Sequence, residues 1–183
     1  LGTGCVDSAM KEVDAEIWTM PSTVKVLRDE SYEEYYTDDP RLDVKLAKNE
    51  SEGVQLMITP EEDVDYYYAS VSDLTDGAGK VIDEIDVYAE FYIRLTKPTN
   101  PNSIRPMGYY PDALIPMDVS ADSKENVIGA GHNQGIYICV TTDEETPAGV
   151  YRGTVTLTIN ATEHLIPIVA TVWAFAVPTE NHA

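Results

Sequence analysis

The sequence predicts an all-β fold, an antiparallel β-sandwich of the immunoglobulin-like or jelly-roll type. Apolar residues recur at every second position from Ala15 onward, which is the period of half-buried strands. Clusters of turn residues separate these runs. The whole chain has 183 residues, enough for one sandwich with its own core and little for two domains.

The first predicted strands lie at residues 42–46 and 54–58, where branched apolar residues recur at every second position. The longest run, residues 85–95, alternates too strictly for a helix. Its apolar face holds Ile85, Val87, Ala89, Phe91, Ile93 and Leu95, and its other face holds Asp86, Tyr88, Glu90, Tyr92 and Arg94.

Turn chemistry and β-branched runs complete the pattern. Residues 76–79, with the sequence Asp-Gly-Ala-Gly, predict a hairpin between strands at Val71 and Val81. Residues 146–149 predict a turn ahead of a strand at 153–159, and a further strand is expected at 136–141.

The last predicted strand, residues 165–175, is apolar on both faces. Ile166, Ile168 and Val172 share one face, while Leu165, Val169, Trp173 and Phe175 share the other. One face would enter the core, so something else must cover the second, either loops of the same domain or a following domain.

Residues 97–123 contain five prolines, which exclude a helix or a central strand because each proline removes a backbone donor. We therefore expect a long ordered loop here. Its Tyr109, Tyr110 and Asp112 combine aromatic rings and a carboxylate on a rigid backbone. Together with Trp173, they are the candidate residues for a domain interface or a glycan contact.

The charge composition excludes two classes of binding partner. Twelve Lys and Arg against 32 Asp and Glu give a formal net charge of -20, which repels nucleic acid and anionic lipid. No apolar stretch is long enough for a transmembrane segment. We expect no nucleic-acid partner and no membrane span.

The start of the chain resembles the end of a bacterial lipoprotein signal, in which Cys5 would be lipidated after cleavage. The alternative is that the sequence simply begins at an arbitrary point. We expect residues 1–14 to be flexible, residues 15–178 to form the sandwich, and residues 179–183 to begin a linker. The expected location is extracytoplasmic, secreted or lipid-anchored.

No catalytic or metal-binding constellation stands out, so we expect no catalytic residue, no metal and no cofactor. Glycosidases need two carboxylates at a fixed separation, and the sequence gives no way to choose a pair among its many. The adjacent Asp83 and Glu84 open a strand, where a solvated turn explains them. The three histidines and two cysteines lack ligand spacing.

Several motifs, in this chain order, resemble the N-terminal sandwich domain of glycoside hydrolase family 123-like proteins, over about residues 16–178. Lys48 and His132 depart from the pattern expected there. The motifs are Trp18–Ser22, Lys25–Asp29, Ala47–Glu50 leading to Gln55–Ile58, Tyr110–Pro116, Gly131–Gln134, Thr146–Val155 and Val172–Phe175.

The resemblance implies a non-catalytic accessory sandwich that precedes and supports a catalytic (β/α) barrel. In that family the barrel acts on glycans containing N-acetylgalactosamine and carries the catalytic Asp-Glu pair, so the catalytic domain would be the partner of this chain. Two other hypotheses remain open: an independent carbohydrate-binding module, with glycan as the partner, and a structural or adhesion-type sandwich at the cell surface.

Overall fold

The computed structural model describes residues 10–98, 100, 102 and 106–179. It contains eleven named strands, one 3-10 turn and one short α-helix among these residues. In chain order they are β1 (Ala15–Pro21), η1 (Glu33–Tyr35), β2 (Leu42–Lys48), β3 (Ser51–Pro60), β4 (Tyr67–Val71), β5 (Leu74–Thr75), β6 (Val81–Ile82), β7 (Ile85–Leu95), β8 (Gly108–Pro116), α1 (Met117–Asp122), β9 (Gln134–Thr141), β10 (Gly149–Ile159) and β11 (Thr162–Ala176).

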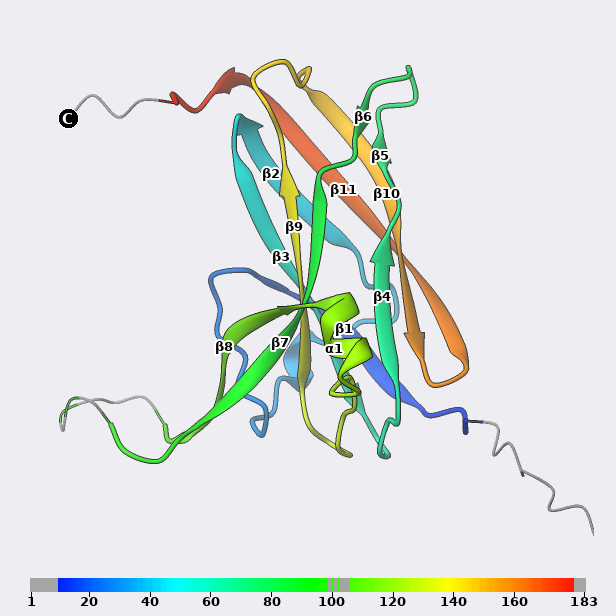
Figure 1. Ribbon diagram of the computed structural model, residues 1–183, viewed down its shortest axis with the longest axis vertical. Coiled ribbons are helices and arrows are strands. Elements are labelled where there is room, and N and C mark those ends of the chain that lie inside the picture. Colours follow the sequence, from blue (N-terminus) through cyan, green and yellow to red (C-terminus); the bar gives the residue numbers. More distant parts are fainter. Residues whose placement is uncertain (1–9, 99, 101, 103–105, 180–183) are drawn as a thin grey trace, which may run out of the picture.

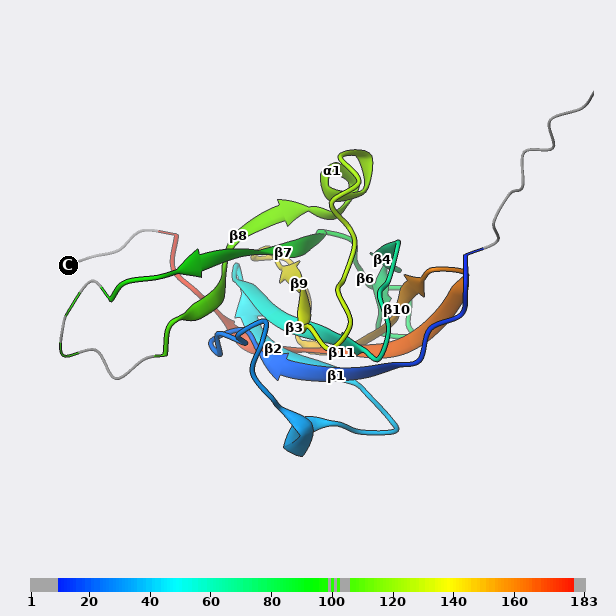
Figure 2. The same ribbon diagram turned by 90° about the horizontal axis from the view of Figure 1, so that it is seen from below.

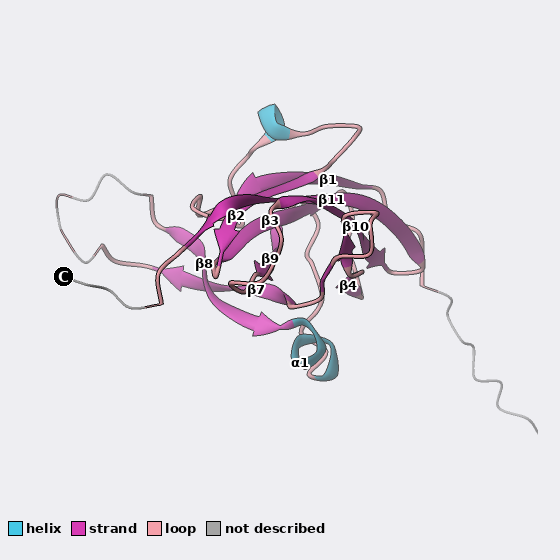
Figure 3. Cartoon of the chain, turned by 90° about the horizontal axis from the view of Figure 1, so that it is seen from above, coloured by secondary structure: helices cyan, strands magenta, loops and turns pink. Residues whose placement is uncertain are grey.

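The strands form two facing sheets, which confirms the predicted all-β sandwich (Figures 1, 2 and 3). Sheet A has the order β1-β3-β9-β7-β8. Sheet B has the order β2-β11-β10-β5-β6, with β4 also paired to β10. The pairings between strands are antiparallel except that of β2 with β11, which is parallel. No helix of the described residues is long and apolar enough to cross a membrane.

Strand alternation builds the core between the sheets, as predicted. The fully buried residues Leu56, Ile136 and Ile138 come from sheet A, and Leu157 and Ile168 come from sheet B. Each of these strands places its alternate residues outside the sandwich. The two apolar faces predicted for β11 therefore separate into one buried and one exposed row.

The predicted long loop at 97–123 is corrected by the structure. Residues 108–116 form β8, paired with β7, and residues 117–122 form α1. The prolines are compatible with β8 because it lies at the edge of sheet A, and the register shifts next to Pro111. Pro116 ends the strand immediately before the helix.

The connection from β1 to β2, residues 22–41, forms a strap across the outer face of sheet A (Figure 2). It starts at one edge of the sheet, where Gln55 Nε2 donates to the carbonyls of Pro21 and Val24. It reaches the other edge at β8, where the Arg28 amide donates to the Tyr109 carbonyl at 3.1 Å. Where the strap crosses it, sheet A therefore lies between the strap and sheet B.

A small aromatic cluster holds the strap on sheet A. Trp18 on β1 is fully buried, and its ring stacks on Tyr32 with the ring centroids 5.5 Å apart. Its Nε1 donates to Thr59 Oγ1, which in turn donates to Asn133 Oδ1. The Asn133 amide donates to the carbonyls of Leu27 and Glu30 in the strap. Core packing and a polar network therefore fix the same segment.

The turn between β10 and β11 contains Asn160, which has a φ of 51° and is buried. Asparagine tolerates this left-handed conformation better than most residues. Its Oδ1 accepts hydrogen bonds from the amides of Asp65 and Tyr66, and its Nδ2 donates to the Lys11 carbonyl. Close by in the chain, Val13 enters the main core. Asn160 thus joins three segments.

We expect Asn160→Ala to destabilise the protein by about 2 kcal/mol, because two partly buried amides lose their acceptor and alanine disfavours the left-handed φ. Urea denaturation measures the change. Asn160→Gly, which tolerates the φ but removes the same hydrogen bonds, should lose less than the alanine variant. Equal stability of Asn160→Ala and the wild type would contradict this role.

Candidate docking surface and adjoining pocket

The structure places Tyr109, Tyr110 and Asp112 together on β8, but their groups already have partners within the chain. The guanidinium of Arg28 lies 3.4 Å from the centroid of the Tyr109 ring, and the Tyr110 hydroxyl donates to the Pro106 carbonyl. Asp112 faces the Lys25 ammonium at 4.0 Å. The Tyr109 ring is therefore not a free platform for a sugar.

Trp173 lies far from these residues, near the end of β11 at the other end of the long axis in Figure 1. Its ring stacks on Phe175 with the centroids 5.6 Å apart, and both side chains are largely exposed, Phe175 at 59%. The structure thus divides the four predicted site residues into two groups. Cys5, the candidate lipidation site, lies outside the described residues.

A second exposed apolar row lies on the arm formed by the ends of β7 and β8. Along β7, Ile85, Val87 and Ala89 pack on the main core. The same face continues with Phe91, Ile93 and Leu95, which are all exposed, at 46%, 39% and 45%. The arm projects beyond sheet B, so nothing in the sandwich covers the continuation of this row (Figure 1).

The arm and the end of β11 project to the same side of the molecule, at the left in both Figure 1 and Figure 2. Each carries exposed large apolar side chains, a feature typical of interaction sites when such residues gather. We call these two groups the cradle: Ile93 and Leu95 on the arm, and Trp173, Phe175 and Val177 at the end of β11.

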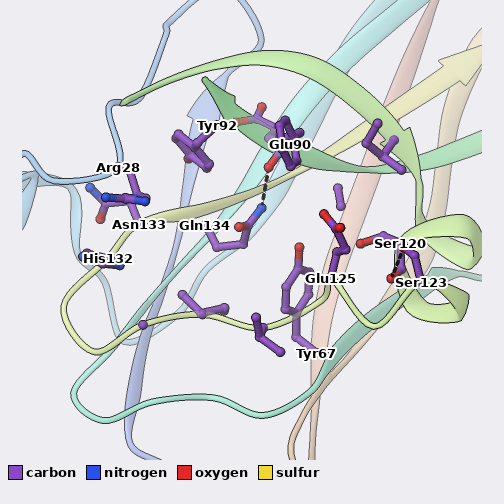
Figure 4. Close-up of a pocket in the computed structure, with 16 residues that line it drawn as sticks. Arg28, Tyr67, Glu90, Tyr92, Ser120, Ser123, Glu125, His132, Asn133 and Gln134 are labelled. Carbon is purple, nitrogen blue, oxygen red and sulfur yellow. Dashed lines mark hydrogen bonds between the residues drawn. The ribbon is translucent and has the colours of Figure 1, made fainter. Parts of the chain in front are cut away.

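A pocket of about 500 Å³ adjoins the base of the arm (Figure 4). Ala89 and Phe91 of β7 and Ile115 of β8 line one side, and the segment from α1 to β9 lines the other. Tyr67 of β4 also lines it, and burial raises the pKa of its hydroxyl. The volume lies within the usual range of small-molecule sites.

Some polar groups of this pocket already have hydrogen-bond partners, and others are available to a ligand. Gln134 Nε2 donates to the carbonyls of Glu90 and Gly135, both at 2.9 Å. With both amide hydrogens used, Oε1 is the atom of this side chain that remains to accept a hydrogen bond. Figure 4 shows the Gln134 amide, the Tyr67 hydroxyl and the Glu125 carboxylate around the same space.

A charged cluster borders the pocket. The Arg28 guanidinium contacts Asp29, with Nε 2.7 Å from Oδ1, and His132 Nε2 lies 3.5 Å from the same oxygen. The pKa of Asp29 is lowered, first by its hydrogen bond with Arg28. Among the described residues, no group of three or more His, Cys, Asp or Glu side chains could hold a metal ion.

Glu90 points to the face of β7 opposite Ala89 and Phe91, beneath the strap, and it also lines this pocket (Figure 4). Its side chain is buried, and Oε2 has no hydrogen-bond partner among the described residues. The carboxyl crosses Gly135, where an added Cβ would lie 2.1 Å from Oε2. Burial raises the pKa of Glu90 to about 7, and the Lys25 ammonium offsets part of that effect. The strap thus encloses an acid with a strongly perturbed pKa.

Sequence reasoning did not identify Glu90, Phe91 or Gln134 as site residues. Alternation placed Glu90 on the polar face and Phe91 on the apolar face of one strand, but it cannot show that a strap buries the first while the second leaves the core. Gln134 stood within one of the family-like motifs, which was the available signal.

Comparison of the sequence with family models and with curated proteins finds no match. Comparison of the structure finds similar folds. A family 123 glycoside hydrolase from Clostridium perfringens, studied for glycolipid glycan hydrolysis, matches with a TM-score of 0.70 and 15% identity. The match covers 92% of this chain and 28% of that enzyme's chain, so this chain has the fold of one part of the enzyme.

Two further solved structures match less well. The CooA pilin subunit from enterotoxigenic Escherichia coli has a TM-score of 0.36 and 13% identity, over 86% of this chain and 99% of that one. AvmM, which catalyses macrocyclization in alchivemycin A biosynthesis, has a TM-score of 0.38 and 5% identity, over 93% and 92% of the two chains. These scores are too low to carry an argument.

Proposed function

We propose that this chain is a non-catalytic accessory β-sandwich of a glycoside hydrolase, which packs against and supports a following catalytic (β/α) barrel. The observation that carries the proposal is the fold match to 28% of a family 123 glycoside hydrolase. The remainder of such an enzyme would contain the catalytic domain. The resemblance of the sequence motifs to the same family, in the same order, supports it independently.

The cradle is the proposed docking surface for that barrel. Trp173 and Phe175 form a stacked pair at one side, and the arm supplies Ile93 and Leu95 at the other. Large aromatic and aliphatic side chains of this kind dominate the binding energy of interfaces when they become buried. A barrel that spans both groups would cover the exposed side chains of the cradle.

If Cys5 is lipidated, it would anchor the enzyme to the cell surface, outside the cytoplasm. Mass spectrometry of the protein purified from its source membrane tests this prediction. A diacylglycerol-modified Cys5 supports it, and an intact segment preceding Cys5 contradicts it.

The docking proposal is tested on the full-length protein that the gene encodes. We expect hydrogen exchange at residues 93–95 and 173–177 to be slower in the full-length protein than in the chain of 183 residues, because docking buries the cradle. Ile93→Ser and Trp173→Ser should each weaken the coupling between the sandwich and the barrel by about 1–2 kcal/mol. Calorimetry would then resolve two melting transitions in place of one.

Leu165→Ser is the matched control, since Leu165 is 70% exposed on the same strand as Trp173 but far along it from the cradle. It should leave the coupling unchanged. A gene that encodes no barrel after this chain would refute the proposal. Unchanged exchange at both segments in the full-length protein would refute the cradle as the docking surface.

A further inference from the structure

The pocket at the base of the arm has the composition of a small-molecule site. Phe91 and Val127 stand exposed at its mouth, at 46% and 53%. Tyr67, which is almost fully buried, forms part of its wall. An aromatic mouth above a partly polar interior binds ligands that have one apolar face and several hydrogen-bonding groups.

The charges around the pocket disfavour an anionic ligand. The chain carries a formal net charge of -20, which opposes an anion. Arg28 lines the pocket, but its guanidinium is already bonded to Asp29 and stacked on Tyr109. Glu90 and Glu125 add two carboxyl groups to the same lining. A neutral ligand avoids the repulsion that an anion meets.

The available polar atoms favour a ligand that donates hydrogen bonds. Gln134 Oε1 is an acceptor whose orientation is fixed by the two carbonyls that bind Nε2. The Glu125 side chain adds carboxylate acceptors, and Ser120 is a further lining residue. Hydroxyl groups on a ring with an apolar face satisfy these acceptors and the aromatic mouth together.

We propose that this pocket binds a neutral saccharide, with one sugar face against Phe91 and sugar hydroxyls donating to Gln134 and Glu125. The site lies within this chain and does not depend on docking to a barrel. It also differs from Tyr109 and Tyr110, whose rings and hydroxyls contact Arg28 and Pro106. The accessory domain would then hold a glycan beside its docking surface.

Saturation-transfer NMR and calorimetry on the chain of 183 residues test the proposal. The probes are a panel of neutral mono- and disaccharides, with glucuronic acid as the anionic comparison. We expect at least one neutral saccharide to bind more tightly than glucuronic acid. Phe91→Ala should weaken its binding by about tenfold, because the stacked ring is lost.

Glu125→Gln, at an exposed position, should weaken binding by about threefold or more, because a neutral amide oxygen is a weaker acceptor than a carboxylate. Phe175→Ala, which removes another exposed aromatic ring outside the pocket, should leave the Kd unchanged. The proposal is overturned if no neutral saccharide binds at millimolar concentration, if glucuronic acid binds best, or if Phe91→Ala has no effect. None of these outcomes affects the docking test.

Discussion

At pH 8, Glu90→Gln should be more stable than the wild-type protein by about 2–3 kcal/mol. The reason is the buried carboxyl of Glu90 beneath the strap, whose Oε2 has no hydrogen-bond partner in the part of the chain that the structure describes. Its pKa is raised to about 7 from an ordinary value of 4.5, which corresponds to about 3 kcal/mol. The glutamine variant has the same shape and never carries the charge.

The direction of the pH dependence follows from the two pKa values of Glu90. Between pH 4.5 and about 7, the unfolded chain has lost this proton while the folded protein still holds it. The unfolded state therefore binds fewer protons, and the stability of the wild type falls as pH rises through this window. Below pH 4.5 Glu90 is protonated in both states and causes no loss of stability. Above about pH 7 it is charged in both states, and the loss of stability stays constant.

Urea denaturation of both proteins between pH 4.5 and 8 measures the difference. Comparing variant with wild type isolates Glu90, because His164, whose pKa is lowered by burial, contributes the opposite slope to both. Glu16→Gln, on the exposed side of β1, should match the wild type throughout. If the stability of Glu90→Gln varied with pH in parallel with that of the wild type, Glu90 could not be a buried acid with a raised pKa.

Trp18→Ala should cost about 3–5 kcal/mol of stability and release the strap from sheet A. Trp18 is fully buried, and its ring contacts three tyrosines of the strap, with centroid distances of 5.5, 6.3 and 5.7 Å to Tyr32, Tyr35 and Tyr36. Replacing a buried tryptophan by alanine removes these contacts and leaves a cavity.

Chemical denaturation gives the loss of stability, and hydrogen exchange at residues 22–41 reports the release of the strap. Phe175→Ala is the control, because it removes an exposed ring that is stacked on one neighbour only, and its effect should stay within about 0.5 kcal/mol. Loss of stability without faster exchange in the strap would show that Trp18 supports the core and not the strap.

Much of the strand pattern could be predicted because alternation is local. The longest run, residues 85–95, coincides with β7 from Ile85 to Leu95, and the predicted strand at 42–46 lies within β2. The turn at 76–79 also forms a hairpin, but it joins β5 to β6, whereas the strand at Val71, which is β4, pairs with β10. Asp76 Oδ1 stabilises its turn by accepting hydrogen bonds from the amides of Ala78 and Lys80.

The segment 97–123 could not be predicted from its prolines, because they exclude a central strand but do not exclude an edge strand. Pro111 is tolerated because β8 is the edge strand of sheet A, so no further strand needs a backbone N–H from this position. That edge position is a property of the assembled sheet. The pairing of β2 with β11 is likewise set by the assembly of the two sheets, since these strands are more than 100 residues apart in the chain.

The sequence by itself determined the all-β class, most strand positions and the two opposite faces of β7 and β11, because the side-chain period of a strand is a property of neighbouring residues. Only the tertiary structure decided which faces are covered. The strap buries Glu90 on a polar face, while Phe91, next to it in the chain, emerges on an apolar face that sheet B does not reach. Burial depends on what lies opposite a side chain in space, so the perturbed acid, the pocket and the cradle could not be identified from alternation alone.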